Sequence, residues 1–311
     1  MKHCQWKEIN SFLQSLEPLK LQCWEVLKLV KEKFSTVSAE TLISIVLQWY
    51  AKVVVDVQPR KYRKGAYSNY KRKVKELGSS VTQGAIYELA KSFNLPPTVY
   101  AGFILNQYVE QKFTIENNAE RKKTAKKFLS NPFSIPDERL SKEVRHSIVM
   151  DDAYGPLVTV IRELTGEDME RLLNKELERI HCKCNSEDEL RRIGTDKTPD
   201  CLLVVPKVVD GVTVKWIESK ALFADESTHQ AYYEKQYKKY VDRFGSGVVI
   251  YFHDFVEELA DEAKKNGILI KNKVPEIHEY CDDEAEIMKL LDTWTEGNEY
   301  NLKIADKFLE L

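Results

Sequence analysis

Long apolar runs are missing from the sequence, and cysteines are few. No segment of the 311 residues approaches the roughly 18 to 20 apolar residues that cross a bilayer. The start of the chain, MKHCQWKEINSFL, lacks the apolar core of a signal peptide. Six cysteines in a chain of this size do not indicate a disulfide framework. We therefore expect a soluble globular protein that stays inside the cell and keeps its cysteines reduced.

A zinc site is the other use that cysteines could have. His181, Cys182 and Cys184 are suitable ligands, but no second pair of ligands lies at the spacing of a zinc finger or zinc ribbon. We interpret the two cysteines as ordinary thiols that follow a helix.

The small net charge of -2 hides an uneven distribution. Residues 1–150 hold 25 Lys and Arg against 14 Asp and Glu, a net charge of +11, whereas residues 151–311 hold 22 against 35, a net charge of -13. A positive first half would attract a polyanion such as nucleic acid. An acidic second half is compatible with a domain that binds a metal cation.

Helical patterns dominate the first part of the chain. Apolar residues recur at helical spacing over 19–34 and 39–55. A further helix begins near residue 84, is broken at 94–97, and is followed by a second helix that Thr98 would cap. These pairs of helices predict helix-turn-helix-like segments.

The second helix of a DNA-binding pair would enter the major groove. Its predicted outward residues, Tyr100, Asn106 and Gln107, are polar but include no arginine. Sequence-specific reading is therefore doubtful, and a protein-binding or architectural use of these helices stays open.

A basic segment rich in tyrosine spans residues 58–77. Its cations could neutralise phosphates, and its tyrosines could stack on unpaired bases or pack against the neighbouring backbone. A solvated helix face would have the same composition. The candidate nucleic-acid contacts are Arg60, Lys61, Arg63, Lys64, Lys71, Arg72 and Lys73. A second basic run, 120–127, is expected to be a helix face or a linker.

Residues 198–220 contain two strand-like runs with carboxylates at their ends. Asp200 precedes the first run, and Glu218-Ser219-Lys220 ends the second. The dipeptide at 210–211, Asp-Gly, predicts the reversal between them. A three-residue loop would set Lys220 opposite Asp200, whereas a two-residue loop would shift the register by one and turn Asp200 to the other face.

Side chains two positions apart in a strand share a face, so Glu218 and Lys220 should lie together. Two carboxylates held close to each other repel unless a cation lies between them, and such oxygen ligands suit Mg²⁺ or Mn²⁺. A bound ion could polarise a phosphodiester and lower the pKa of a water, while Lys220 could orient that water or stabilise the developing charge. The predicted catalytic residues are Asp200, Glu218 and Lys220, and the two carboxylates are the predicted metal ligands.

This arrangement resembles the signature of the PD-(D/E)xK nucleases. Pro199-Asp200 matches its first part and Glu218-x-Lys220 its second. An ordinary surface hairpin could carry the same three charged residues, so the neighbouring segments matter.

Two neighbouring helices carry further resemblances to this superfamily. Gln236-x-x-x-Tyr240, on a helix expected over 226–243, is similar to the Q-x-x-x-Y helix of RecB-like members. That similarity implies that Gln236 and Tyr240 orient the substrate or the lysine. Glu170, four residues after a glycine, resembles the further carboxylate that resolvase-like members supply as a metal ligand, and Glu176 and Glu178 compete for this role.

Longer blocks resemble the codanin-interacting nuclease family over roughly residues 20–275. They are YGPLV at 154–158, DKTPD at 196–200, WIESKA at 216–221, YVDRFG at 240–245 and VVIYF at 248–252. The resemblance implies helix-turn-helix-like segments ahead of a PD-(D/E)xK domain. It also implies a metal-dependent nuclease of the nucleus and cytoplasm that pairs with codanin and, in vertebrates, is associated with red-cell development.

The predicted fold class is therefore α+β with several domains. A helical helix-turn-helix-like module covers 1–130, a linker and connecting helix 131–152, a restriction-endonuclease-like domain with a mixed sheet flanked by helices 153–275, and an acidic C-terminal tail 276–311. The rival function is a non-catalytic adaptor that kept the nuclease fold and mainly binds codanin. The choice between DNA and RNA and the oligomeric state stay open.

Overall fold

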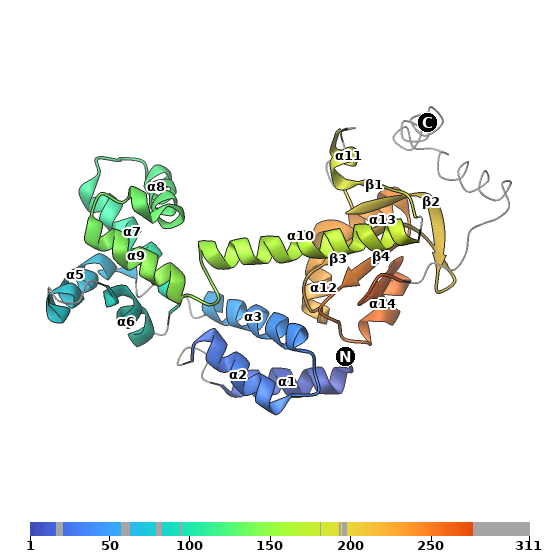
Figure 1. Ribbon diagram of the computed structural model, residues 1–311, viewed down its shortest axis with the longest axis horizontal. Helices are drawn as coiled ribbons and strands as arrows, with labels where there is room; N and C mark the ends of the chain where they lie inside the picture. Colours follow the sequence, from blue (N-terminus) through green and yellow to red (C-terminus); the bar gives the residue numbers. More distant parts are fainter. Residues whose placement is uncertain are drawn as a thin grey trace. The chain divides into compact units, whose positions relative to one another are not determined.

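The computed structural model describes residues 1–16, 21–56, 63–78, 83–93, 95–180, 182–192, 194 and 198–275 (Figure 1). The chain divides into two compact units. One is Lys7–Leu164, and the other combines Met1–Trp6 with the described residues of Thr165–Leu311. The predicted tail and two of the predicted basic contacts, Arg60 and Lys61, lie outside the described residues. Within the described ranges, no helix has both the length and the apolar character that crossing a membrane requires.

The unit Lys7–Leu164 contains helices and no strand in its described part. The helices are α1 (His3–Ser15), α2 (Cys23–Lys33), α3 (Ala39–Asp56), α5 (Ala66–Leu77), α6 (Ala85–Ser92), α7 (Pro97–Lys112), α8 (Asn118–Ser130), the 3-10 helix η1 (Pro132–Ser134), α9 (Glu138–Met150) and the first part of α10 (Pro156–Arg179). The predicted helix over 39–55 is confirmed as α3, and the basic run 120–127 is part of α8.

Helix α7 lies at the centre of this unit, in contact with α5, α6, α8 and α9. Ile104 and Leu105 of α7 are fully buried, and Leu140 and Val144 of α9 belong to the same core. Residues of the predicted connector 131–152 therefore pack into the helical unit. Tyr100 is also fully buried, so the prediction that it faces outward is wrong. Neighbouring helices cover the side of α7 on which it lies.

A buried carboxylate caps the start of α7. The carboxylate of Asp151 accepts a hydrogen bond of 2.9 Å from the backbone amide of Thr98 and a second bond from the Thr98 hydroxyl. The helix begins at Pro97, and its first free amides are thus satisfied from the end of α9. The predicted role of Thr98 as the cap is wrong, because Thr98 lies inside the first turn and donates to Asp151.

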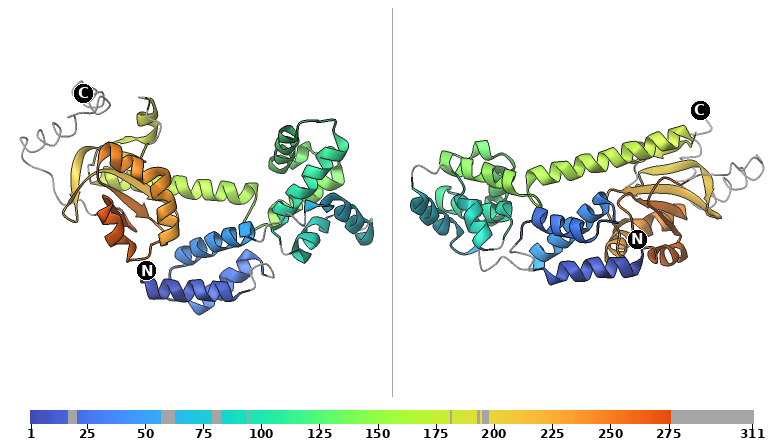
Figure 2. Two further views of the ribbon diagram at one scale, coloured as in Figure 1. Left: turned by 180° about the vertical axis from the view of Figure 1, so that it is seen from behind. Right: turned by 60° about the horizontal axis from the view of Figure 1, so that its bottom comes forward.

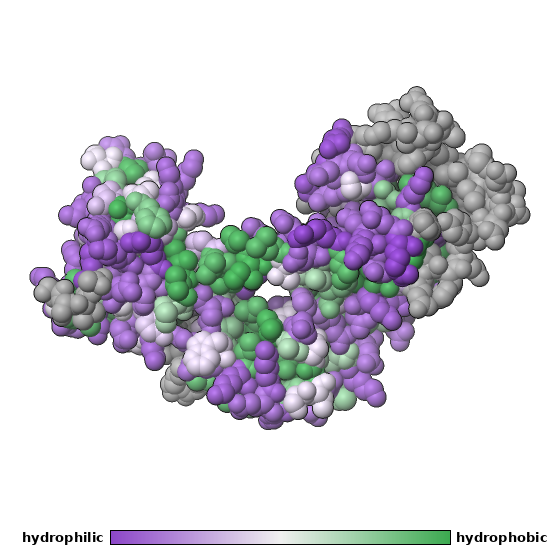
Figure 3. Space-filling view, in the orientation of Figure 1, coloured by the Kyte–Doolittle hydropathy of each residue, from purple (hydrophilic) through white to green (hydrophobic). Residues whose placement is uncertain are grey.

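An apolar stripe is exposed on the first turns of α10, visible as green surface in Figure 3. Leu157, Val160, Ile161 and Leu164 share one helix face by their spacing, and each is about half exposed, at 46–53%. Farther along the same helix, Leu173 and Leu177 are buried against the sheet. One helix therefore serves as core in its second half and as apolar surface in its first.

The second unit is built on a five-stranded sheet. Its elements after α10 are β1 (Cys184–Ser186), α11 (Glu187–Arg192), β2 (Cys201–Val209), β3 (Val212–Lys220), α12 (Glu226–Tyr232), the π-helical turn η2 (Tyr233–Tyr237), α13 (Lys238–Phe244), β4 (Gly247–Tyr251), α14 (Leu259–Lys265) and β5 (Ile268–Lys271). The strand order is β1-β2-β3-β4-β5, antiparallel from β1 to β3 and parallel from β3 to β5. The predicted α+β class with a mixed sheet flanked by helices is confirmed.

The sheet lies between α10 on one face and α12 to α13 on the other (Figures 1 and 2). Ile217 of β3 packs in one core cluster with Leu173 and Leu177 of α10. Its neighbour Trp216 points the other way and meets the ring of Tyr240 in an edge contact at 5.3 Å between centroids. Gly247, opposite Trp216 on β4, leaves room for the indole, since a Cβ atom there would lie 2.1 Å from it.

The β2–β3 hairpin corrects the predicted loop. Val209 pairs with Val212, so the loop has two residues, and both Asp210 (φ 49°) and Gly211 (φ 72°) are left-handed, as in a type I′ turn. The three-residue loop predicted for this hairpin is wrong. A bulge between Leu202 and Lys207 then shifts the register, so that Cys201 pairs with Ile217. The next position along brings Asp200 beside Glu218, so the bulge returns Asp200 to the face from which a two-residue loop alone would turn it.

The first residues of the chain belong to the sheet unit. The amino group of Met1 lies 3.0 Å from a carboxylate oxygen of Asp254, and the ring of Trp6 contacts Phe223 at 5.3 Å between centroids. Sequence reasoning placed the whole of 1–130 in the helical module, and the first helix was not predicted, since the pattern was read only from residue 19 onward.

Candidate active site

Asp200 and Glu218 meet at the ends of β2 and β3. The backbone amide of Asp200 donates to Oε2 of Glu218 at 3.2 Å. Oδ2 of Asp200 accepts from the backbone amide and the hydroxyl of Ser219, both at 2.7 Å. The predicted convergence of these two carboxylate residues is therefore present, with Asp200 next to Glu218 and not opposite Lys220.

Lys220 completes a group of three charges. Its ammonium donates to Oε1 of Glu218 and lies over the ring of Tyr232, 5.3 Å from the centroid. The side chain of Glu218 is 2% exposed and that of Lys220 is 16% exposed. The lysine thus sits between a buried carboxylate and an aromatic face, which attracts a cation through its π electrons.

Burial shapes the electrostatics of this group. The pKa of Glu218 is raised to about 8, first by burial and then by the charge of Asp200, while the adjacent Lys220 opposes the shift. Burial alone would lower the pKa of Lys220, but the charges of Glu218 and Asp200 outweigh it, so the pKa of the lysine is raised. Lys220 therefore stays charged near neutral pH.

Of the three carboxylates proposed on α10, Glu170 interacts with the site. Partial desolvation of its carboxyl group raises its pKa, and the charges of Asp200 and Glu187 raise it further, while Lys220 lowers it. Glu176 is instead bonded to Arg179 at 2.8 Å on its own helix, and Glu178 is exposed. Among the described residues, no three His, Cys, Asp or Glu side chains are already gathered closely enough to hold a metal ion.

Tyr240 and Gln236 lie on the helix beside the site without bonding to Lys220. The hydroxyl of Tyr240 donates to the backbone oxygen of Thr198 at 2.8 Å, two residues before Asp200. Oε1 of Gln236 is buried and has no hydrogen-bond partner among the described residues. Tyr240 thus fixes the backbone that leads into Asp200, whereas the orienting role predicted for Gln236 remains a prediction.

Several residues of the site were missed by sequence reasoning. Ser219 holds Asp200, Tyr232 lies under Lys220, and Glu187 of α11 accepts from the Thr198 hydroxyl at 3.2 Å. A spacing signal existed for one of them, because Tyr232, Gln236 and Tyr240 follow each other at intervals of four. The central residue of the triplet, Ser219, was visible in the sequence but was read only as a spacer.

A buried hydrogen-bonded chain lies on the same face of the sheet. The hydroxyl of Tyr251 lies 2.9 Å from Nδ1 of His229 and 3.2 Å from the hydroxyl of Tyr237. Tyr251 pairs with Lys220 across β3 and β4. Burial lowers the pKa of His229 to about 4, so this imidazole is neutral at physiological pH and serves as a fixed polar support beneath the site.

The basic segment predicted to bind nucleic acid lies in the helical unit. Of its described cations, Arg63, Lys64, Lys71 and Arg72 are exposed and Lys73 is half-buried. The two described tyrosines among them, Tyr67 and Tyr70, are not available for stacking on bases, because they are 4% exposed and belong to the core of α5 and α7. Of the two uses predicted for these rings, packing is the one observed.

The sequence was compared with protein families and with curated proteins. A family model described as "Protein of unknown function TPD sequence-motif" matches residues 136–274. In this chain the letters TPD are Thr198-Pro199-Asp200. Curated proteins called CDAN1-interacting nuclease 1 are similar over most of their length: the one from Xenopus tropicalis is 35% identical over 277 residues, covering 89% of both chains. Those from Mus musculus and Homo sapiens are 36% and 35% identical, covering 87% of this chain and 94% of theirs.

The chain belongs to the CDAN1-interacting nuclease 1 family. The resemblance predicted from the sequence blocks is thereby confirmed. No solved structure matches the chain. In this member of the family, the TPD segment is held from both sides, by Tyr240 through Thr198 and by Ser219 through Asp200. The names of the relatives describe nucleases that interact with CDAN1.

Proposed function

We propose that this protein is a divalent-cation-dependent nuclease of PD-(D/E)xK type that hydrolyses phosphodiester bonds of nucleic acid. The observation that carries the proposal is the meeting of Asp200, Glu218 and Lys220 at the ends of β2 and β3. Two carboxylates and one ammonium lie on a sheet flanked by helices. These are the charged groups, in the chain order, that the resemblance to the PD-(D/E)xK nucleases implies. The names of the relatives support the same reaction class.

The chemistry of the donor set fits Mg²⁺ or Mn²⁺. Asp200 and Glu218 would hold the ion, and Glu170 would add a third oxygen ligand from α10, because hard cations take carboxylate oxygens. Burial and the neighbouring charge of Asp200 raise the pKa of Glu218, and a bound cation would favour its ionised form. When bound, the ion would polarise the phosphodiester and lower the pKa of the attacking water.

The residues of the chain have separate tasks in this proposal. The ammonium of Lys220 would orient the water or offset the negative charge that grows on the phosphate oxygens. Ser219 keeps Asp200 in place through two hydrogen bonds, and Tyr240 fixes the backbone at Thr198. Gln236 would orient the substrate or Lys220, as the resemblance to the Q-x-x-x-Y helix implies.

The partner and the setting are part of the same proposal. The relatives are named for interaction with CDAN1, and we extend codanin as a partner to this chain, together with a place in the nucleus and cytoplasm. The rival function is an adaptor of nuclease fold that works by binding codanin without catalysis.

A cleavage assay separates the two functions. Labelled single-stranded, duplex and branched DNA and RNA are incubated with the protein in Mg²⁺ or Mn²⁺, beside the variants Asp200→Asn and Lys220→Met. We expect cleavage that falls at least about a hundredfold in both variants, since each loses one charged group of the site. Glu176→Gln is the matched control and should retain full activity, because Glu176 pairs with Arg179 away from the site.

The adaptor makes the opposite prediction. No substrate would be cut under any condition, and capture of codanin would be the same for the wild type and both variants. Circular dichroism of each variant checks that a loss of cleavage does not come from unfolding.

A further inference from the structure

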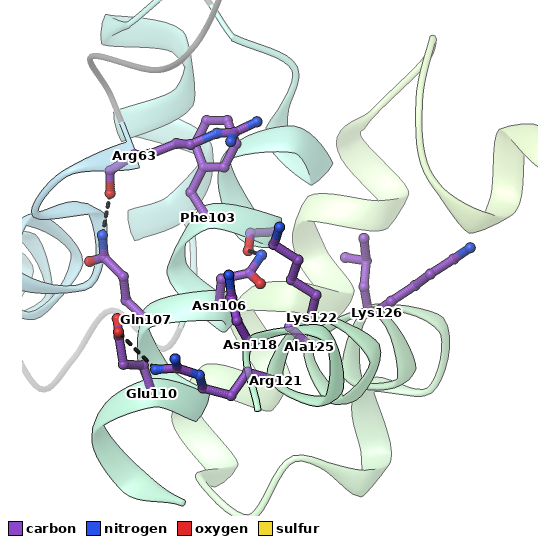
Figure 4. Close-up of a pocket in the computed structure, with 12 residues that line it drawn as sticks. Arg63, Phe103, Asn106, Gln107, Glu110, Asn118, Arg121, Lys122, Ala125 and Lys126 are labelled. Atoms are coloured by element: carbon purple, nitrogen blue, oxygen red, sulfur yellow. Dashed lines mark hydrogen bonds and ion pairs between the residues drawn. The ribbon is translucent and has the colours of Figure 1, made fainter. Parts of the chain in front are cut away.

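A groove runs between α7 and α8 on the helical unit (Figure 4). Its volume is about 560 Å³, within the range of roughly 300–1,000 Å³ that small-ligand sites occupy. Residues from three separate stretches of the chain line the groove. They come from the basic segment around Arg63, from α7 with Phe103 and Asn106, and from the basic helix α8 with Lys122 and Lys126.

The charge in the groove is predominantly positive. Four cations line it, Arg63, Arg121, Lys122 and Lys126, against one carboxylate, Glu110. Glu110 is engaged by Arg121 at 2.9 Å, which leaves the other three cations without compensation from within the groove. Nε of Arg121 is buried and has no hydrogen-bond partner within the described ranges. The guanidinium of Arg121 is nonetheless already paired, and the excess positive charge of the groove comes from Arg63, Lys122 and Lys126.

The backbone around Arg63, on one side of the groove, is hydrogen-bonded to α7. Nε2 of Gln107 donates to the backbone oxygen of Arg63, and Oε1 of Gln107 accepts from the backbone amide of Tyr67 at 2.9 Å. The guanidinium of Arg63 lies over the ring of Phe103, 5.2 Å from its centroid (Figure 4). A planar guanidinium held on an aromatic ring leaves its outer face as a platform on which an unpaired base can stack.

The shape of the groove favours a single strand. Helix α7 packs against α5, α6, α8 and α9, so its polar side forms the floor of a depression and does not project as a recognition helix would. Lys122 and Lys126 are one turn apart on α8, about 6 Å along its axis, which lets them contact successive phosphates of one extended strand.

We propose that this groove binds a segment of single-stranded nucleic acid. Lys122 and Lys126 neutralise its phosphates, and Arg63 on Phe103 supports a base. The inference rests on the proposed function, in which nucleic acid is the substrate, and adds that the substrate has an unpaired stretch that the helical unit holds.

The test is fluorescence anisotropy of labelled oligonucleotides of about ten nucleotides, the size range of single-strand sites. The protein is the full chain with Asp200→Asn in EDTA, so that cleavage cannot interfere. Lys122→Ala with Lys126→Ala should weaken binding of single strands about 10- to 30-fold near 0.1 M salt. It should also reduce the slope of log Kd against log salt by about 1.4, which is about 0.7 for each phosphate that a lysine no longer neutralises.

The matched control removes the same two charges from the same helix. Lys123 and Lys127 line a separate depression on α8, so Lys123→Ala with Lys127→Ala should change the affinity less than about threefold. Equal losses in both double variants, or none in either, would overturn the proposal. Tighter binding of duplex than of single strands would also overturn it, as would capture of vesicles with anionic phospholipid in preference to oligonucleotides.

Failure of this inference can be told from failure of the proposed function. Single-strand binding that depends on Lys122 and Lys126, in a protein that cleaves no substrate, would support binding in the groove and contradict the proposed nuclease activity. Cleavage that depends on Asp200, together with single-strand binding that does not depend on either lysine, would support the nuclease activity and contradict binding in the groove.

Discussion

At the scale of single residues, burial has a strong effect on the pKa of Glu218. Its carboxyl group is almost fully buried beside Asp200, and Lys220 is the cation bonded to it. Taking a carboxylate out of water favours its neutral form, and a neighbouring carboxylate adds to the effect. This residue should therefore make the stability of the protein depend on pH in a way that a surface glutamate does not.

The pKa of Glu218 is about 8 in the folded protein against the ordinary glutamate value of 4.5, so the folded state holds the proton more tightly. The contribution to the free energy of unfolding is fully present below pH 4.5 and is lost as the pH rises through 8. We expect a fall on the order of 5 kcal/mol across this window in EDTA, since each pKa unit is worth about 1.4 kcal/mol, measured by urea unfolding, and its absence in Glu218→Gln. The control Glu176→Gln should keep the wild-type slope. A slope that survives in Glu218→Gln would assign it to another group.

At the scale of elements, the helix formed by α12, η2 and α13 fixes the loop that leads into Asp200. Tyr240 reaches across from α13 to the backbone of Thr198, and its ring packs against Trp216. The Tyr240 hydroxyl would therefore affect catalysis by holding the backbone at Thr198 in place, and not by contacting the reacting groups. Its effect should therefore be separable from that of Lys220.

Tyr240→Phe removes only the hydroxyl. We expect the free energy of unfolding to fall by about 1 kcal/mol, the worth of one such hydrogen bond, and kcat to fall about tenfold with KM unchanged. Urea unfolding and steady-state cleavage measure the two effects. The control Tyr233→Phe, on the π-helical turn, should leave both unchanged, since Tyr233 is only partly buried. A change in KM alone would place the Tyr240 hydroxyl on the substrate.

Elements with their own sequence signals could be predicted, and elements made by packing could not. The strand at 268–271 and the helix at 39–55 have apolar patterns that identify them within a residue or two. Strand β1 has three residues and no period, and the bulge between Leu202 and Lys207 arises from how β2 fits β3. The neighbourhood of Asp200 and Glu218 was predicted correctly while the loop was wrong, because the bulge compensated for the shorter turn.

Burial on several sides explains the error at α7. Tyr100 was assigned to the surface because it is polar and lies apart from the apolar positions, yet four helices surround α7 and cover it. A helical wheel assumes one buried face, and that assumption fails for a central helix. The groove between α7 and α8 could not be predicted for the same reason, because it depends on which helix packs next to which.

At the scale of the whole molecule, each unit has its own hydrophobic core. Leu105 lies in the core of the helical unit and Ile250 in that of the sheet unit, and both are fully buried. Nucleic-acid binding is proposed for the first unit and hydrolysis for the second. The two functions should therefore be separable by mutations that weaken one core at a time.

Leu105→Ala and Ile250→Ala should each cost about 2–5 kcal/mol of stability in their own unit. Native-state hydrogen exchange should show faster exchange in α5 to α9 for the first variant and in β3 to β5 for the second. Faster exchange across both units in either variant would mean that the chain unfolds as one cooperative whole.

The most direct test of the account is a calorimetric titration of the full chain with Mn²⁺. We expect one ion per chain, bound more tightly as the pH rises from about 6 to about 9 and releasing a proton, because Glu218 must ionise. Binding should be lost in Asp200→Asn and in Glu218→Gln and kept in Glu176→Gln. Binding of the same strength in all four proteins, or none in the wild type, would contradict the claim that Asp200 and Glu218 hold a metal ion beside Lys220.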